Sequence, residues 1–185
     1  MDKIWLRALE PDDYKYTHQW RTDDATWSSV AGTKRFVSLD TERRWLINAL
    51  ESHEKGDVLR FVICVGESEI PVGMISANSI DHINKTCEIS RMIAPESRGL
   101  GIVKKAMILV YDYLYSQLGV NRIESRVLED NIASIRSQEK FGSVQEGVLR
   151  KAIFKDGKFK DLICFAMLRE EFYELYSEII ACDNR

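Results

Sequence analysis

Hydrophobic residues change their spacing several times along the chain, and each change marks a different predicted element. Residues 58–65 are almost continuously apolar, which is typical of a strand covered on both faces. After Gly101, apolar residues recur every three or four positions as far as Leu118, which predicts a long amphipathic helix. The same patterns predict further strands at 4–9, 71–77, 87–93, 123–128, 144–154 and 162–168, and further helices at 11–20, 38–52, 131–141 and 170–180.

This succession of elements predicts a single domain over residues 1–185 with a mixed α/β sheet. A length of 185 residues fits one domain with a sizeable hydrophobic core. Apolar residues make up 45% and charged residues 30%, which is the balance of an ordinary globular protein. No internal repeat and no linker rich in Pro, Gly or Ser divides the sequence.

Charge and hydropathy exclude several classes of protein. There are 26 Lys and Arg against 29 Asp and Glu, giving a net charge of −3, and this mild acidity argues against a nucleic-acid or anionic-membrane binder. No apolar run approaches the roughly 18 residues that a membrane span needs. Charged residues at positions 2, 3 and 7 argue against a signal peptide. We therefore predict a cytoplasmic protein with no nucleic-acid or membrane partner.

The cysteines and histidines give no metal-binding pattern. The sequence contains no C-x-x-C, and no Cys and His are spaced as zinc ligands. Cys64, Cys87 and Cys164 lie within apolar runs, and Cys182 lies in the tail. We expect reduced, mostly buried thiols and no metal site.

The segment with the clearest chemistry is 87–102, where a predicted strand runs into a turn and then into the long helix. The first turn of a helix leaves about four N–H groups without partners, and the helix dipole adds partial positive charge there. Gly99 and Gly101 leave room for a ligand near the backbone, and Arg98, Lys104 and Lys105 add positive charge. The pattern indicates a phosphate site, although a simple glycine-softened connection has the same spacing. A dinucleotide fingerprint and a P-loop are both absent.

Four segments in order carry a resemblance to a known family. Residues 98–103, Arg-Gly-Leu-Gly-Ile-Val, resemble the R/Q-x-x-G-x-G/A acetyl-CoA motif of the GNAT N-acetyltransferase superfamily. The other three segments resemble its ribosomal-protein-acetyltransferase branch, the RimJ/RimL type. They are residues 6–13, the N-x-x-S and E-K-x-G elements with the following Glu-Gly at 131–147, and the closing hairpin with Met-Leu at 156–168.

The resemblance implies a fold with two splayed parallel strands, here 87–93 and 123–128, between which acetyl-CoA binds. Met92 and Ile93 are implied to present backbone groups to the pantetheine arm. Asn131 and Ser134 are implied to contact the arm or the adenosine side. The implied pyrophosphate site consists of backbone amides of Arg98, Gly99, Leu100, Gly101, Ile102 and Val103.

Two positions depart from the family pattern. Val103 stands where the motif has Gly or Ala, and we expect weaker or shifted cofactor binding from steric crowding. Gln138 stands where many members carry the Tyr that protonates the leaving thiolate, and an amide cannot supply that proton at neutral pH. The neighbouring Ser137 is a poor acid. A thiol of pKa about 8.5 is already a fair leaving group, so the thiolate can leave unassisted or through water.

The general base and the acceptor region are less sharply marked. Glu88, on the strand beside the expected cleft, is the first candidate base and Glu124 the second, with an ion pair to Arg91 or Arg126 as the structural alternative for Glu88. Residues 14–36 are expected to recognise the substrate. Their aromatic and charged residues, Trp20, Arg21, Trp27 and Phe36, are equally compatible with a place in the core.

The function implied is transfer of an acetyl group from acetyl-CoA to a primary amine by direct attack, without a metal. The expected acceptors are a protein N-terminal amine first, an amino-sugar nucleotide second and a polyamine third, so the partner is a small-molecule amine or a protein N-terminus. A homodimer is left open. The alternative is a non-catalytic acyl-CoA-binding module of the same fold, which Val103 and Gln138 keep open.

Overall fold

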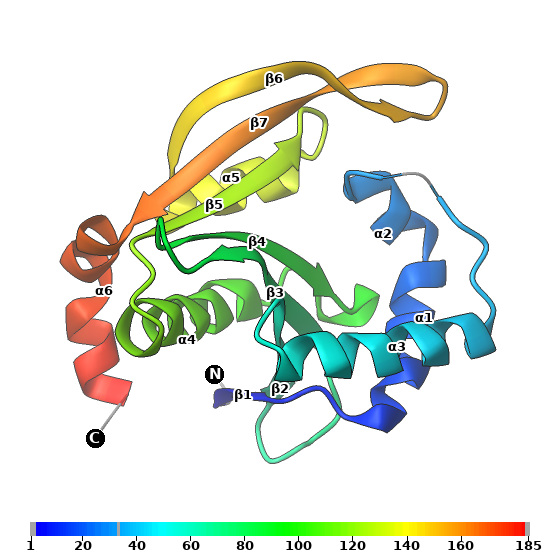
Figure 1. Ribbon diagram of the computed structural model, residues 1–185, viewed down its shortest axis with the longest axis horizontal. Coiled ribbons are helices and arrows are strands. Elements are labelled where there is room, and N and C mark those ends of the chain that lie inside the picture. The colour runs from blue at the N-terminus through cyan, green and yellow to red at the C-terminus, as the bar shows by residue number, and fades with distance from the viewer. Residues whose placement is uncertain (1–2, 33, 184–185) are drawn as a thin grey trace.

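A seven-stranded mixed sheet forms the centre of the molecule (Figure 1). The computed structural model describes residues 3–32 and 34–183, so both ends of the predicted domain range lie outside the described residues. The strand order is β1-β2-β3-β4-β5-β7-β6, and only the β4–β5 pair is parallel. The strands are β1 Ile4–Arg7, β2 Leu59–Val65, β3 Gly73–Asp81, β4 Thr86–Ile93, β5 Arg122–Leu128, β6 Val144–Lys155 and β7 Lys158–Leu168.

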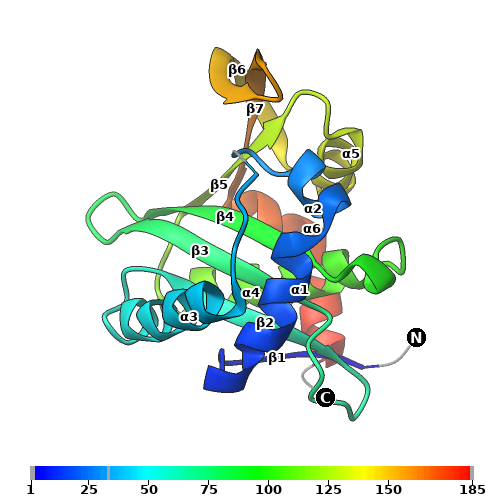
Figure 2. The same cartoon turned by 90° about the vertical axis from the view of Figure 1, so that its right-hand side faces the viewer.

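Helices cover both faces of the sheet (Figure 2). One face carries α1 Tyr14–Thr22, α2 Asp24–Ser29 and α3 Leu39–Glu54, and the other carries α4 Ile102–Gln117, α5 Ile132–Phe141 and α6 Arg169–Asp183. Short 3₁₀ turns at Pro11–Asp13 and Pro95–Ser97 precede α1 and α4. The mixed sheet with helices on both sides confirms the predicted fold class.

Alternating side chains of the central strands build two separate cores. Ile63 and Ile75 point toward α4 and join a large cluster, while Val62 and Met74 point toward α1 and α3. The larger cluster contains aromatic rings in edge-to-face and tilted contacts, such as Tyr111 with Phe141 and Phe172. This packing fixes α4, α5 and α6 on one side of the sheet.

The first helical region differs from the prediction. The sequence predicts one helix over 11–20, whereas the structure has a 3₁₀ turn, then α1, and then a second helix, α2, that the pattern did not predict. Asp23 separates α1 from α2 because its backbone is extended and its side chain accepts a hydrogen bond from the Thr26 amide, which caps α2. A six-residue polar helix has no apolar period from which it could be predicted.

Two strands extend by four residues beyond one of their predicted ends. The hairpin between β6 and β7 turns at Asp156 and Gly157, both with positive φ, so pairing begins directly at Lys155 and Lys158. As a result β7 starts four residues before the predicted Leu162. β3 likewise continues beyond Ala77 to Asp81, with an irregular register between Asn78 and Asp81.

Among the described residues, no helix combines the length and apolar character needed to cross a membrane. Cys64 and Cys87 are buried, Cys164 is half-buried and Cys182 is exposed, and none of them forms a disulfide. Burial raises the pKa of the Cys87 thiol to about 12. No group of three or more His, Cys, Asp or Glu in the described ranges is arranged to hold a metal ion.

Candidate acetyl-CoA cleft and acceptor pocket

The parallel strands β4 and β5 pair at one end and then separate. Thr86, Cys87 and Glu88 pair with Arg122, Ile123 and Glu124, and the register ends there. Beyond this point β4 remains paired only with β3, so its other edge is open from Ile89 to Ile93 (Figure 1). Unpaired backbone N–H and C=O groups on such an edge are ready to bind an extended, amide-containing ligand. Met92 and Ile93, named from the sequence, lie on this open edge.

The turn that follows β4 has the geometry of an anion site. Gly99 and Gly101 adopt left-handed conformations, with φ of 78° and 74°. α4 begins directly after Gly101 and no side chain caps it. A Cβ at Gly99 would meet no atom within 4 Å, so the backbone there is open to a ligand. The uncapped N–H groups of α4 are therefore available to a phosphate group.

The remaining side chains of the glycine turn lie in different surroundings. Leu100 is exposed, Ile102 is buried, and Val103 packs against the larger core cluster. The side chain of Val103, at the position of the family's Gly or Ala, is thus partly accommodated by the core. The Arg98 guanidinium binds the Asp23 carboxylate at 2.9 Å and the Thr26 hydroxyl at 2.5 Å. Hydrogen bonds from Thr26 and Arg98 lower the pKa of Asp23.

Three distant elements hold α2 beside this cleft. Arg98 binds its N-terminal end, and Asn131 donates to the Ser29 carbonyl at 2.7 Å. Lys155, buried at the tip of the β6–β7 hairpin, donates to the carbonyls of Trp27, of Val30 at 2.9 Å and of Gly32 at 3.2 Å. A lysine at a helix C-terminus satisfies carbonyls that the helix leaves free. These contacts position a helix too short to be stable alone.

α5 approaches the open edge of β4 through its first turn. Asn131 caps α5 by accepting from the Ser134 amide at 3.0 Å. The Ser134 hydroxyl accepts from the Arg91 guanidinium at 3.1 Å, and Arg91 also contacts the sulfur of Met107 on α4 at 3.1 Å. Burial lowers the pKa of Arg91. The Arg91 guanidinium therefore bridges α4 and α5 where the strands separate, whereas the sequence suggested it only as a possible partner of Glu88.

Gln138 forms hydrogen bonds at both ends of its amide. Its Nε2 donates to the Ser125 hydroxyl at 2.6 Å, and its Oε1 accepts from the Ser143 hydroxyl at 2.9 Å. The side chain is 2% exposed, and these contacts join α5 to β5 and to the start of β6. Ser137, its neighbour, is half-buried. The amide at the family's Tyr position is thus held by the protein itself.

Glu88 and Glu124 stand side by side at the point where β4 and β5 separate. Glu88 has a loose ion pair with Arg126, at 3.7 Å between Oε2 and Nη1. Glu124 binds the Arg122 Nε at 2.7 Å, and Arg122 also holds Glu146. Alternation along β4 places Glu88 on the same sheet face as Ser90 and Met92. Of the two carboxylates, Glu88 has the weaker partner.

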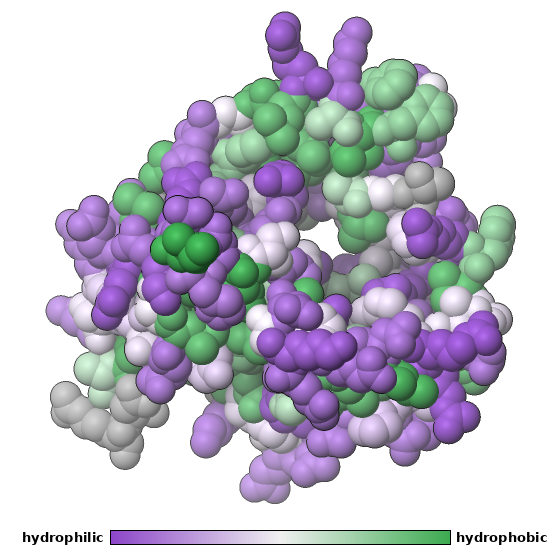
Figure 3. All heavy atoms as spheres, in the orientation of Figure 1, coloured by the Kyte–Doolittle hydropathy of each residue, from purple (hydrophilic) through white to green (hydrophobic). Residues whose placement is uncertain are grey.

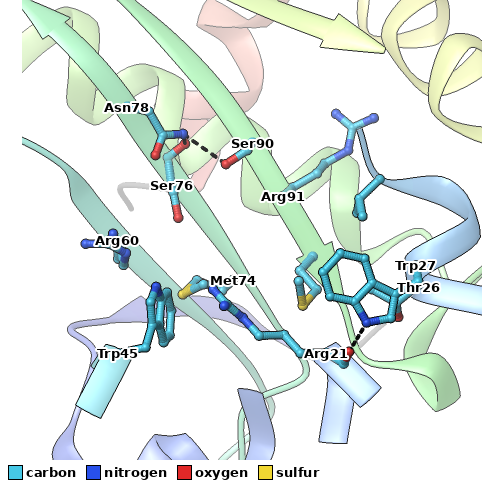
Figure 4. Close-up of a pocket in the computed structure, with 12 residues that line it drawn as sticks. Arg21, Thr26, Trp27, Trp45, Arg60, Met74, Ser76, Asn78, Ser90 and Arg91 are labelled. Atoms are coloured by element: carbon cyan, nitrogen blue, oxygen red, sulfur yellow. Dashed lines mark hydrogen bonds between the residues drawn. The ribbon is translucent and has the colours of Figure 1, made fainter. Parts of the chain in front are cut away.

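On that face the structure contains a pocket of about 350 Å³. The space-filling view in Figure 3 shows a hollow between the part of the molecule with β5, β6 and β7 and the part with α2 and α3. Residues of α1, α2, α3, β2, β3 and β4 line the pocket (Figure 4), and Asn78 on β3 donates to the Ser90 hydroxyl at 2.9 Å. The volume suits a small molecule. The same face carries Glu88 beside the pocket, so a ligand in it lies next to the open edge of β4.

The expected recognition residues separate into three groups. Arg21 and Trp27 line the pocket, and the Trp27 indole donates to the Arg21 carbonyl. Trp20 is buried in the smaller core, and Phe36 is 99% exposed. Trp45 and Arg60 are among the lining residues that lie outside the expected range 14–36. The position of Arg60 could have indicated a functional residue, because it is the one charged residue in the otherwise apolar run 58–65. Trp45 gave no such indication, because it continues the apolar face of α3.

Comparisons with known proteins agree with this geometry. Residues 3–144 match the acetyltransferase (GNAT) domain family. The SPbeta prophage-derived uncharacterized N-acetyltransferase YokL of Bacillus subtilis (strain 168) is 32% identical over 171 residues, covering 92% of this chain and 93% of the relative. The spermidine N(1)-acetyltransferase of Escherichia coli (strain K12) is 26% identical, covering 91% and 88%.

A solved structure shows the same fold. The crystal structure of spermidine N-acetyltransferase from Vibrio cholerae in complex with CoA and spermine superposes with a TM-score of 0.81 at 24% identity, covering 91% of this chain and 97% of the other. The splayed strands and the glycine turn therefore occur in a fold seen with CoA bound. The family match spans most of the chain and agrees with both features, so this protein belongs to the GNAT family of N-acetyltransferases and is an acyltransferase that uses acetyl-CoA as cosubstrate.

Proposed function

We propose that this protein transfers the acetyl group of acetyl-CoA to the primary amine of an acceptor bound in the pocket beside β4. The observation that carries the proposal is the open edge of β4 from Ile89 to Ile93, which has the acceptor pocket on one face and the uncapped N-terminus of α4 at its end. A ligand extended along this edge joins the anion site to the pocket. Acetyl-CoA has phosphate groups at one end and amide groups along its arm, which is the pattern that these two features require.

In this proposal the cofactor is held mainly by backbone groups. The N–H groups of Gly99 to Val103 bind the pyrophosphate, and the open edge at Met92 and Ile93 pairs with the pantetheine amides. Ser134 and Arg91 lie where the arm passes between α4 and α5. Asn131 acts through the cap of α5 and the contact with α2.

The reaction proposed is a single direct transfer. The neutral amine attacks the carbonyl carbon of the thioester, so a C–N bond forms and the C–S bond breaks. Glu88 takes the proton that the amine loses, and the departing thiolate takes a proton from water. Because Gln138 cannot give a proton and is held by Ser125 and Ser143, the proposal assigns it no acid role.

The arrangement of Gln138 also favours a second candidate, a non-catalytic acyl-CoA-binding module. It shares the cleft and the glycine turn with the enzyme and differs only in lacking turnover. YokL and both spermidine enzymes are named as acetyltransferases, which supports the catalytic function.

The test is release of free thiol from acetyl-CoA in the presence of a panel of primary amines, with acetyl-CoA binding measured separately. We expect amine-dependent release that falls at least about tenfold in Glu88→Gln, with acetyl-CoA affinity unchanged. Glu124→Gln is the matched control, because this carboxylate lies opposite Glu88 but is paired with Arg122. Tight acetyl-CoA binding without release for any amine would favour the binding module.

A further inference from the structure

The acceptor pocket is lined by three arginines, Arg21, Arg60 and Arg91, and in the described part of the chain no Asp or Glu lines it. Arg21 and Arg60 both lie against the Trp45 ring, with their Cζ atoms 3.7 Å and 5.6 Å from its centroid. Figure 4 shows these two side chains at one end of the pocket and Arg91 directed away from them, toward the gap between the strands. The pocket therefore has a cationic end formed by Arg21 and Arg60.

Of the two arginines at this end, only Arg21 forms an ion pair with a carboxylate of the described residues. Arg21 pairs with the fully buried Glu42, at 3.3 Å between Nε and Oε1. Arg60 donates to the Ala49 carbonyl at 3.0 Å, and no carboxylate of the described residues lies within 4.0 Å of its guanidinium. One positive charge at the cationic end is therefore left without a partner.

Because Arg60 is partly removed from water, its unpaired charge is energetically unfavourable. Arg60 is half-buried, and its desolvation, followed by repulsion from Arg21, lowers its pKa. Desolvation also lowers the pKa of Arg21. Arginine remains charged in proteins, so the electrostatic cost is not relieved by loss of a proton. An anion that entered this end would relieve it, because guanidinium groups bind carboxylate and phosphate with charge-assisted hydrogen bonds.

Beside the cationic end, the pocket is lined by neutral polar side chains. Ser76 is the neighbour of Arg60 across the β2–β3 pair and of Ser90 across the β3–β4 pair, and Asn78 donates to the Ser90 hydroxyl (Figure 4). This row leads from Arg60 to β4, the strand that carries Glu88. The oxygen atoms of these polar side chains can accept hydrogen bonds from an amine. A molecule with an amine at one end and an anionic group at the other would thus match the pocket along its length.

We propose that the acceptor is a small primary amine that also carries a carboxylate or phosphate, bound with its anion between Arg21 and Arg60 and its amine toward Ser90. This inference rests on the proposed acetyl transfer and names its substrate class. It disfavours a polyamine, because like charges repel in a partly desolvated site. The chain therefore differs in acceptor chemistry from the spermidine acetyltransferases whose fold it shares.

Charge-matched pairs of amines test the proposal. We expect the kcat/KM for thiol release to be at least about tenfold higher for glucosamine 6-phosphate than for glucosamine, or for γ-aminobutyrate than for butylamine. The two pairs distinguish phosphate from carboxylate. Equal or faster turnover of the neutral members, or of spermidine, would overturn the inference while leaving acetyl transfer intact.

Variants connect this preference to Arg60. In Arg60→Met we expect the advantage of the anionic member to disappear with unchanged acetyl-CoA affinity, and in Arg60→Lys to be partly restored. Arg44→Met is the matched control, because Arg44 is an exposed arginine on α3 that pairs with Asp40, away from the pocket lining. A loss of turnover that is equal for both members of a pair would contradict a role in recognising the anion.

Binding of inorganic phosphate separates this inference from the proposed function. Calorimetry is performed on protein saturated with CoA, so that the glycine turn is already occupied. We expect phosphate to bind, and to bind at least about tenfold more weakly in Arg60→Met than in Arg44→Met. Phosphate binding without turnover of any amine would refute the proposed function and keep the anion site, whereas absence of phosphate-dependent heat would refute the anion site.

Discussion

The two sides of the proposed site differ in what forms them. The side proposed for acetyl-CoA consists largely of backbone: an open strand edge, two glycines with positive φ and an uncapped helix N-terminus. The side proposed for the acceptor consists of side chains from six elements, with Arg21, Trp45 and Arg60 at its cationic end. Backbone geometry changes little when side chains are exchanged, whereas a pocket wall changes with each substitution. The comparison explains how one fold can keep a cosubstrate and change its acceptor.

The largest effect is expected on the cofactor side, from Gly99→Val. The branched side chain strains a backbone with φ of 78° and fills the space that the pyrophosphate needs, so we expect acetyl-CoA affinity to fall about 100-fold. Gly56→Val is a close control, because Gly56 has φ of 76° and is equally open, at the end of α3. Calorimetric titration with acetyl-CoA should show the loss only at position 99. Equal losses in both variants would indicate general strain.

On the acceptor side, Lys155→Met should have the next largest effect. It removes the donor for three carbonyls at the end of α2, and we expect a loss of about 2 kcal/mol in the free energy of unfolding. Since α2 carries Trp27, the KM for the acceptor should rise while acetyl-CoA affinity is retained. Lys158→Met, at the exposed cross-strand neighbour, is the control. A selective loss of acetyl-CoA binding would contradict the division between the two sides.

Between the two sides, Gln138→Leu should affect stability more than chemistry. The Ser125 and Ser143 hydroxyls lose their partner, which we expect to cost about 1–3 kcal/mol in urea unfolding. The turnover rate should change less than about threefold, and Ser137→Ala should change neither quantity. If turnover instead fell by about two orders of magnitude at normal stability, the amide would be a participant in the reaction.

The smallest effect is expected from Asp23→Asn. Asp23 links the glycine turn to α2, because it caps this helix and pairs with Arg98. Asparagine also caps helices, so this change mainly removes the charge that faces Arg98. Because the ion pair is partly exposed, we expect a loss of about 0.2–1 kcal/mol at pH 7.

The lowered pKa of Asp23 determines how the stability difference between the wild-type protein and Asp23→Asn changes with pH. The carboxylate stabilises the fold at pH values above its unfolded pKa, and this contribution is lost as the pH falls through the lower folded pKa. The wild-type protein and the variant should therefore become equally stable in acid. Urea unfolding at pH 7 and at pH 3 measures the difference, and a gap that widens in acid would contradict the assignment.

Much of the fold was predictable because its signals are local. The amphipathic period after Gly101 predicted α4, and the apolar run 58–65 predicted β2 almost to the residue. The glycine turn was marked by two glycines, and its positive φ values are ones that glycine adopts without strain. The helix α2 was not predicted, because Arg98, Asn131 and Lys155 hold it from parts of the chain about 70 to 130 residues away.

By itself the sequence indicated the family, the order of the elements apart from α2, and the two glycines of the turn, because each of these signals is carried by residues that are neighbours in the chain. Tertiary structure alone decided which side chains meet at the acceptor. Trp45 had the pattern of a core residue and Arg60 was one charge in an apolar strand, while Arg21 was expected in substrate recognition but with no indication of its neighbours. Only the packing of α1 and α3 against β2 brings them together, and the charge left over there is a property of the assembled pocket.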